Sequence, residues 1–184
     1  LYVNNTGAVN DNFNLSVAGT PAGWSVQFRA DGGAGNCSTV GPALASTGTI
    51  NAGANRLVCA EVTVPQANSG QANPGTSNLD FTATSATNGA VSDVKRDAVT
   101  ILAVHNVTLT PTGTQQTFPG GSVTYTHVLT NLGNSAETIS FAAGFLTDTR
   151  AAQGWTSAAY VDGNNNGVFD PGVDDVPANA ISVA

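Results

Sequence analysis

The sequence predicts an all-β fold built from antiparallel β-sandwiches. Thr, Ser, Asn, Ala, Gly and Val fill most positions, methionine is absent and lysine occurs once, a composition that favours strands over helices. Short segments alternate apolar and polar residues, and helical periodicity is nowhere sustained. Turn-rich connectors such as residues 67–75 and 117–121 separate these segments, as an antiparallel topology requires.

The alternating segments locate the strands. We expect strands at residues 57–64, 79–85, 91–109 with an interruption, 123–130 and 139–141. In residues 123–130 the alternation places Val123, Tyr125, His127 and Leu129 on one face and mainly threonine on the other. This pattern predicts a sandwich strand with one solvated face.

An internal repeat organises the chain. Residues 5–15 and 131–141 share an Asn-x-Gly turn, an acidic position and an alternating apolar run, at a constant offset of 126 positions. Further on, Gly-Trp recurs at residues 23–24 and 154–155, and Asp-Gly at residues 31–32 and 162–163. We expect each copy to place its turn before a half-buried strand and its tryptophan in the core of a sandwich.

The repeat predicts two domains with a junction near His105. Residues 1–104 form the first copy, which lacks the opening strand that residues 107–127 supply to the second copy. Residues 105–184 form the second copy, which is incomplete at its C-terminal end. Two explanations stay open. The chain is a piece of a longer protein, or the second copy of one subunit completes the first copy of the next by strand addition.

The small share of charged residues and the negative net charge limit the classes of partner that the chain can bind. Charged residues make up 9% of the chain, against about 25% in a typical protein, so hydroxyl and amide groups must supply its solubility. The net charge of −7 and the lack of a basic patch argue against nucleic acid. No apolar run reaches the roughly 20 residues of a transmembrane helix, and if the protein is exported, its signal was removed before Leu1. Clustered carboxylates favour divalent cations, calcium first.

The two cysteines, Cys37 and Cys59, form neither a zinc-ligand pattern nor a Cys-x-x-Cys redox motif. The simplest interpretation is a single disulfide in an oxidising, extracellular compartment. Two buried free thiols are the alternative. The hydroxyl-rich composition favours the disulfide.

The most specific local motif lies at residues 162–175 and predicts a calcium-binding loop. Its oxygen donors follow the order of an EF-hand loop, with Gly167 at the turn. The predicted ligands are Asp162, Asn164, Asn166, the carbonyl of Val168, Asp170 and Asp174. Val173 stands where an EF-hand has its bidentate glutamate, which predicts modest affinity, roughly 0.1 to 1 mM. The alternative is a plain Asn-Gly turn with solvated carboxylates.

The first copy differs at the matching place. It reads Asp31-Gly32-Gly33-Ala34-Gly35-Asn36-Cys37, so glycines replace the asparagine ligands and a cysteine is present. We therefore expect a disulfide to stabilise this loop where calcium stabilises the other. No metal ligand is predicted in the first loop.

Catalytic motifs are not found in the sequence. His105 and His127 are the two histidines, and neither is accompanied by a nucleophile elbow, a metal-ligand pair or a phosphate-binding loop. We predict no catalytic residue and no enzyme. Tyr160 and Phe169 lie beside or within the calcium loop and are the candidate contacts to a glycan.

Four motifs in order carry a resemblance to a known family. They are Gly120-Gly121-Ser122-Val123-Thr124-Tyr125-Thr126, Asn131-Leu132-Gly133-Asn134, Gly154-Trp155 and Asp162-Gly163-Asn164-Asn165-Asn166-Gly167. This order resembles the conserved-repeat domains of bacterial surface proteins, which occur in tandem in large envelope, S-layer-like and adhesin proteins. The resemblance covers residues 107–175 well and residues 1–100 more loosely. It implies immunoglobulin-like sandwiches, export and a structural or adhesive role, with no catalytic residue.

These features together predict a structural component of a bacterial extracellular surface layer or filament, stabilised by calcium. Its expected partners are further copies of itself or neighbouring domains of a longer surface protein. The alternative is an adhesive or carbohydrate-binding module of a secreted surface protein, in which Tyr160 and Phe169 contact the glycan.

Overall fold

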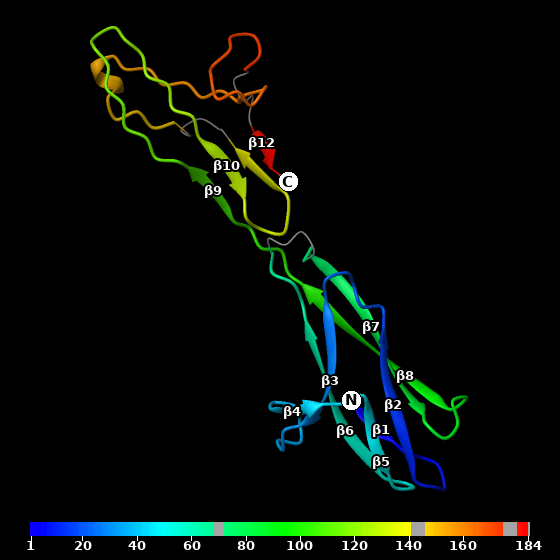
Figure 1. The fold of residues 1–184 in the computed structure, drawn as a ribbon. Helices are drawn as coiled ribbons and strands as arrows, with labels where there is room; N and C mark the ends of the chain where they lie inside the picture. The colour runs from blue at the N-terminus through cyan, green and yellow to red at the C-terminus, as the bar shows by residue number, and fades with distance from the viewer. Residues whose placement is uncertain (68–71, 141–145, 175–179, 184) are drawn as a thin grey trace. The chain divides into compact units, whose positions relative to one another are not determined.

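The computed structural model describes residues 1–67, 72–140, 146–174 and 180–183. The chain divides into two compact units, Leu1–Leu102 and Ala103–Ala184, which are described separately below (Figure 1). Antiparallel strands are the main regular structure in the described residues of both units, which also include one short 3-10 helix, η2 (Ala151–Gln153). The predicted all-β class is therefore confirmed.

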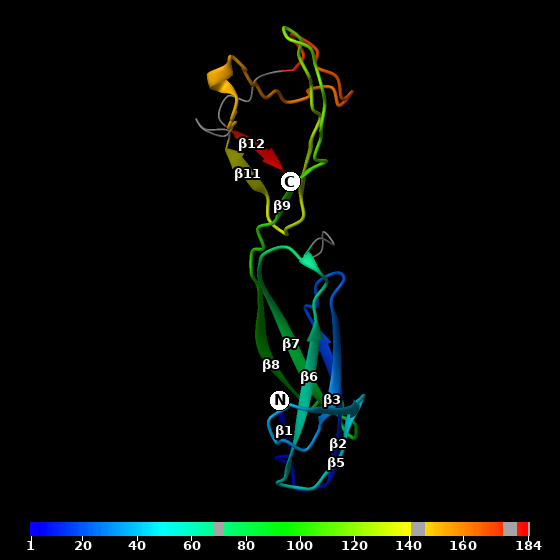
Figure 2. The ribbon, with the colours of Figure 1, turned by 90° about the vertical axis from the view of Figure 1, so that its left-hand side faces the viewer.

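Unit Leu1–Leu102 contains two four-stranded antiparallel sheets (Figure 1, Figure 2). One sheet has the order β1 (Tyr2–Asn4), β6 (Asn55–Thr63), β3 (Ser25–Asp31) and β4 (Val40–Ala43). The other has the order β5 (Ser46–Ile50), β2 (Asp11–Ala18), β7 (Gly75–Ser85) and β8 (Ser92–Ile101). The edge strands of the two sheets are thus β1 and β4, and β5 and β8.

The core of this unit lies between the two sheets. Its buried cluster draws on both sheets and consists of Val3, Phe13, Phe28, Ile50, Val58, Leu79 and Phe81. The rings of Phe28, from one sheet, and Phe81, from the other, meet edge to face with centroids 6.0 Å apart. Alternation explains which side chains are inside, because Leu79 and Phe81 point inward from β7 while Asp80 between them pairs with Arg96 on the outer side. The arrangement is a β-sandwich.

The described residues of unit Ala103–Ala184 form two pairs of antiparallel strands. Strand β9 (Val107–Thr110) pairs with β10 (Val128–Asn131), and β11 (Glu137–Ser140) pairs with β12 (Ala180–Val183). Among the side chains whose burial is described in this unit, only Asp174 is buried. Large apolar side chains such as Leu109 and Trp155 are instead more than half exposed.

Most predicted strands are present, with one clear difference. Segments 57–64 and 79–85 correspond to β6 and β7, and segment 91–109 to β8 and β9 with an interruption between them. Segment 139–141 overlaps β11, although residue 141 lies outside the described residues.

The strand predicted at residues 123–130 is wrong in extent, since β10 covers only Val128–Asn131. The pairing with β9 ends at Thr110 opposite Val128, and the next residue, Pro111, has no N–H to continue the ladder. Side-chain contacts hold the segment instead: the Nδ1 of His127 lies 2.7 Å from the Pro111 carbonyl, and the Tyr125 hydroxyl accepts from the Gln115 N–H.

The two tryptophans differ, which corrects the expectation that both fill a core. Trp24, just before β3, is buried with 9% of its surface exposed. Trp155 is 53% exposed. A matching sequence position is therefore not enough to bury a ring, because burial requires strands that cover it on the other side.

The Asn-x-Gly turn has the same hydrogen bonds at both of its occurrences. The Oδ1 of Asn5 accepts from the N–H of Gly7, and its Nδ2 donates to the carbonyls of Val9 and Ile50. The Oδ1 of Asn131 accepts from the N–H of Gly133, and its Nδ2 donates to the carbonyls of Ser135 and Val183. In each turn, one asparagine side chain therefore bonds to the strand that pairs with the strand after the turn. This is β5, which pairs with β2, in the first unit and β12, which pairs with β11, in the second.

Candidate functional site

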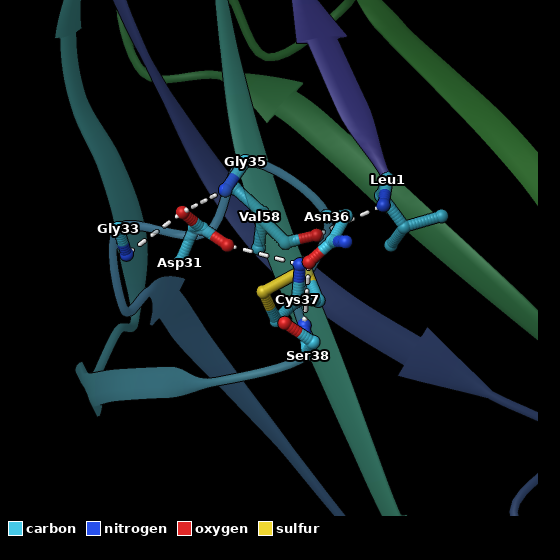
Figure 3. The surroundings of a disulfide bond; sticks show 9 residues. Leu1, Asp31, Gly33, Gly35, Asn36, Cys37, Ser38 and Val58 are labelled. Atoms are coloured by element: carbon cyan, nitrogen blue, oxygen red, sulfur yellow. Dashed lines mark hydrogen bonds between the residues drawn. A yellow bond between two sulfur atoms is a disulfide. The ribbon is translucent and has the colours of Figure 1, made fainter.

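The loop between β3 and β4 is organised around the carboxylate of Asp31. Its Oδ2 accepts from the N–H groups of Gly33 and Gly35, at 2.9 and 2.8 Å, and its Oδ1 accepts from that of Cys37 at 2.9 Å (Figure 3). These bonds, that from Gly35 foremost, lower the pKa of Asp31 because they stabilise the charged form. The small residues of this loop let successive backbone N–H groups turn toward one side chain, Gly33 and Gly35 both having positive φ.

Cys37 and Cys59 form the disulfide expected from the sequence (Figure 3). Cys37 lies in the Asp31 loop, and Cys59 is a buried residue of β6, 22 positions later. The bond therefore attaches the loop to a central strand of its sheet. The loop is held at two points, by the Asp31 carboxylate and by the disulfide.

The ligand atoms of Asp31, Cys37 and Cys59 lie within 4.8 Å of one another, the only such group of three His, Cys, Asp or Glu ligands among the described residues. Thiolates are the metal ligands that cysteine provides, and both sulfurs here are bonded to each other. The carboxylate of Asp31 already accepts from three backbone N–H groups. In its oxidised form this cluster therefore has a structural role, which is to hold the loop in place.

The loop at residues 162–174 is organised in a related way. Asp162 accepts from the N–H of Asn166 through Oδ1 and from that of Gly167 through Oδ2, at 3.2 and 2.7 Å. The bond from Gly167 is the main reason that the pKa of Asp162 is lowered. Asn165 and Gly167 have φ of 57° and 76°, the left-handed conformations that tighten the turn.

Three of the predicted calcium ligands meet at one carboxylate oxygen. The Nδ2 groups of Asn164 and Asn166 both donate to the Oδ2 of Asp170, at 2.9 and 2.6 Å. Asp174, 6% exposed, closes the loop from the other end, because its Oδ1 accepts from the N–H of Gly163 and its Oδ2 from that of Asp170. Side-chain hydrogen bonds thus link Asn164 and Asn166 to Asp170, whereas the carboxylates of Asp162, Asp170 and Asp174 do not form a group of three with ligand atoms within 4.8 Å of one another among the described residues.

The donor set suits calcium in its chemistry. Ca²⁺ takes six to eight oxygen ligands, and the loop offers three carboxylates, two amide carbonyls and the Val168 backbone carbonyl. In this conformation Asn164 and Asn166 donate to Asp170 through Nδ2, while their Oδ1 atoms accept from the backbone N–H groups of Asn166 and Val168. Asp162 and Asp174 face backbone N–H groups, and each carboxylate keeps further lone pairs available.

The two candidate glycan contacts are adjacent in space. The rings of Tyr160 and Phe169 have centroids 4.2 Å apart at 41°, and the two residues are 45% and 40% exposed. Since Phe169 belongs to the Asp162 loop, the conformation of the loop positions this aromatic pair.

The hydrogen-bond partners of the two histidines are a carboxylate and a backbone carbonyl. His105 Nδ1 lies 2.5 Å from Glu137 Oε1, and His127 Nδ1 lies 2.7 Å from the Pro111 carbonyl. Both histidines are exposed, and the ring of His127 is stacked against Tyr125. These contacts connect segments that are distant in the chain, as structural hydrogen bonds do.

Sequence reasoning missed a cleft in unit Leu1–Leu102. Its volume is about 670 Å³, and it lies between β1 with its following loop and strands β2, β7 and β8. Core phenylalanines Phe13, Phe28 and Phe81 line it. No sequence signal marks the cleft, because its walls come from strands far apart in the chain.

No helix in the described part of the chain is long and apolar enough to cross a membrane. Compared with known proteins, the chain matches no family model and has no significant match among curated proteins or solved structures.

Proposed function

We propose that this protein is a structural component of a bacterial extracellular surface assembly, a surface layer or filament, built from immunoglobulin-like repeats and stabilised by calcium. The observation that carries the proposal is the pair of Asp-Gly loops. In each loop a leading aspartate gathers backbone N–H groups, those of Gly35 and Cys37 on Asp31 and those of Asn166 and Gly167 on Asp162. A covalent bond completes the first loop, and an oxygen-rich donor set is available to complete the second.

The chemistry of the chain supports a place outside the cell. A disulfide persists in an oxidising compartment, and weak calcium sites, with dissociation constants of roughly 0.1 to 1 mM, are filled where calcium is abundant. A surface rich in hydroxyl and amide groups, with 9% charged residues, suits lateral packing because few charges need to be desolvated. The proposal includes no catalytic activity.

Electron microscopy and light scattering of the purified chain, in calcium and then in EDTA, test the proposal. We expect ordered filaments or sheets in calcium that dissolve in EDTA. Calorimetric titration with calcium should give a dissociation constant of roughly 0.1 to 1 mM.

Two variants assign the metal effect to the loop. Asp170→Ala removes the carboxylate on which Asn164 and Asn166 converge, and we expect it to abolish calcium binding. Asp93→Ala is the matched control, since this exposed carboxylate pairs with Lys95 in the other unit. A chain that stays monomeric in calcium, or calcium binding that survives Asp170→Ala, would contradict the proposal.

A second candidate function rests on the aromatic pair. Tyr160 and Phe169 present two exposed rings in contact beside the Asp162 loop, and such rings stack on sugar faces. An adhesive module predicts binding on a glycan array that is lost in the Tyr160→Ala and Phe169→Ala variants. Phe118→Ala is the control, because Phe118 is 88% exposed and is not part of this pair. Absence of glycan binding by the wild-type chain would reject this candidate.

A further inference from the structure

Three side chains that can bind a metal ion lie together on the outer face of the sheet that contains β6. They are Asp31, Cys37 and Cys59, whose ligand atoms lie within 4.8 Å of one another. Side chains alternate along a strand, so Cys59 points away from the core in which its neighbour Val58 is packed. The disulfide brings the loop of Asp31 and Cys37 onto this outer face, where Cys59 is only 3% exposed (Figure 3).

The positions of the three groups do not depend on the disulfide alone. The N–H of Cys37 donates to the Oδ1 of Asp31, so Cys37 stays beside this carboxylate when its sulfur is released. A backbone hydrogen bond of 2.9 Å from the Gly32 N–H to the Thr39 carbonyl closes the base of the same loop. Cys59 is held by β6, an interior strand of its sheet. Breaking the bond between the sulfurs therefore leaves three ligand groups close together.

The charges of the reduced group favour a cation. Two thiolates and a carboxylate at such distances repel one another. Arg29 lies directly opposite Cys59 and shares its face of the sheet, but its guanidinium is already paired with Glu61. The Asp31 carboxylate stays charged, because the N–H groups of its loop lower its pKa. A divalent cation would neutralise two of the three negative charges and would thus favour loss of both thiol protons.

The types of ligand indicate which cation fits. Ca²⁺ and Mg²⁺ take oxygen ligands, whereas Zn²⁺ binds cysteine sulfur together with carboxylate oxygen. Around a tetrahedral Zn²⁺ with bonds of about 2.0 to 2.3 Å, ligand atoms stand roughly 3.3 to 3.8 Å apart. This spacing is compatible with a group whose members lie within 4.8 Å of one another. Residues 32–36 of the loop are exposed, so the loop has room to move as the sulfurs separate.

We propose that the chain binds one Zn²⁺ through Cys37, Cys59 and Asp31 when its disulfide is reduced, with water as the fourth ligand. The same side chains then hold the loop in the oxidised form and hold a metal ion in the reduced form. This inference goes beyond the proposed function and does not depend on it.

A dithiol reductant supplies the electrons. One of its thiolates attacks the Sγ of Cys37, which is more exposed than Cys59, and Cys59 leaves as a thiolate when the S–S bond breaks. The second thiol of the reductant then displaces Cys37. The reductant becomes a cyclic disulfide, and two electrons and two protons pass to the cysteine pair. Zn²⁺ replaces these two protons, which are released to solvent.

Metal titrations of the full chain test the site. The chain is reduced with dithiothreitol, separated from it in the absence of oxygen, and titrated with Co²⁺, whose thiolate complexes have a charge-transfer band in the near ultraviolet. We expect this band to saturate at one Co²⁺ per reduced chain, to disappear when Zn²⁺ is added and to be absent from the oxidised chain. Competition with a chromophoric chelator gives the affinity for Zn²⁺, which a large excess of Ca²⁺ should leave unchanged.

Variants of the ligands assign the site. Asp31→Asn keeps an acceptor for the loop N–H groups but removes the charge. It should weaken Zn²⁺ binding at least about tenfold, since loss of a group that merely supports a ligand already costs about 10- to 100-fold. Cys37→Ser and Cys59→Ser should each weaken binding further and reduce the charge-transfer band. Asp93→Asn is the matched control, because this exposed carboxylate pairs with Lys95 on β8.

Circular dichroism establishes that each reduced chain is folded. Should a reduced chain be unfolded without metal, recovery of its β-sheet spectrum with Zn²⁺, and not with Ca²⁺, becomes the measurement. A reduced wild type that gives no charge-transfer band, or that stays unfolded in Zn²⁺, would overturn the proposal. So would Zn²⁺ binding of equal affinity in the oxidised chain, or in Asp31→Asn. Assembly in calcium is measured on the oxidised chain, so failure here leaves the proposed function unaffected.

Discussion

The two units of the chain share a turn and differ in their cores. Asn5 and Asn131 make the same three kinds of hydrogen bond in the same kind of turn. Yet unit Leu1–Leu102 buries apolar residues between two four-stranded sheets, whereas Asp174 is the only buried residue among those of Ala103–Ala184 whose burial is described. Local sequence is therefore sufficient to build the turn, and a core requires that strands from two sheets face each other.

The largest expected effect contrasts two phenylalanines. Phe81 is 5% exposed and meets Phe28, so Phe81→Ala should lower the free energy of unfolding by about 3 to 5 kcal/mol through lost burial and a cavity. Phe118 is 88% exposed, and Phe118→Ala should change it by about 0.5 kcal/mol or less. Urea unfolding monitored by circular dichroism measures both. Equal effects would show that the two units have comparable cores.

The disulfide should stabilise one loop only. Replacing Cys37 and Cys59 by serine opens a cross-link between residues 22 positions apart and should lower the free energy of unfolding by about 3 kcal/mol. Calcium binding by the Asp162 loop should be unchanged, because its donors are all in residues 162–174. Urea unfolding and calorimetric calcium titration of the same variant give both quantities. Loss of calcium affinity in this variant would show that the loops are coupled.

Replacing each of the two matched asparagines should have a smaller effect, and the two effects should differ. Asn5 is 4% exposed, so Asn5→Ala leaves the carbonyl of the buried residue Ile50 without its donor and should cost about 1 to 3 kcal/mol. Asn131 makes the same bonds but is only partly buried, and water can replace its donor at the carbonyls, so Asn131→Ala should cost less. Denaturant unfolding ranks the two variants. The reverse order would mean that the second turn is the more strongly stabilising one.

The smallest effect is the pH dependence of the Asp31 loop. Hydrogen bonds from Gly35 and Cys37 lower the folded pKa of Asp31 below its unfolded value of about 3.9. The carboxylate therefore contributes stability that is present above about pH 4 and is lost as the pH falls through the lower folded pKa. Asp31→Asn should flatten this part of the stability profile. The free energy of unfolding of both chains, measured from neutral to acid pH, tests this prediction. The same dependence on pH in variant and wild type would contradict it.

Sequence patterns anticipated much of the fold where the signal was local. Alternation located β6 and the C-terminal part of β7, and the lack of a zinc or redox motif, with the hydroxyl-rich composition, indicated the disulfide of Cys37 and Cys59. The same reasoning overextended the strand at residues 123–130, because it considered one strand without its partner, in which Pro111 ends the ladder. It also expected Trp155 to be buried, and burial depends on neighbours that the Gly-Trp dipeptide does not specify.

For the candidate sites, too, the sequence was informative only where the signal was local. The donors of the Asp162 loop are close in sequence, so their spacing was enough to group them, although the convergence of Asn164 and Asn166 on Asp170 became visible only in three dimensions. The cleft beside β1 had no sequence signal at all.

By itself the sequence determined the strand class, the turns and the disulfide pair, because alternation, Asn-x-Gly chemistry and two lone cysteines act over short stretches or leave one pairing. Only the tertiary structure decided which apolar side chains are buried, in which order the strands lie in each sheet and which phenylalanines reach the cleft. These are properties of strands brought together from distant positions, and hydrophobic burial depends on the surfaces that meet rather than on the order of residues.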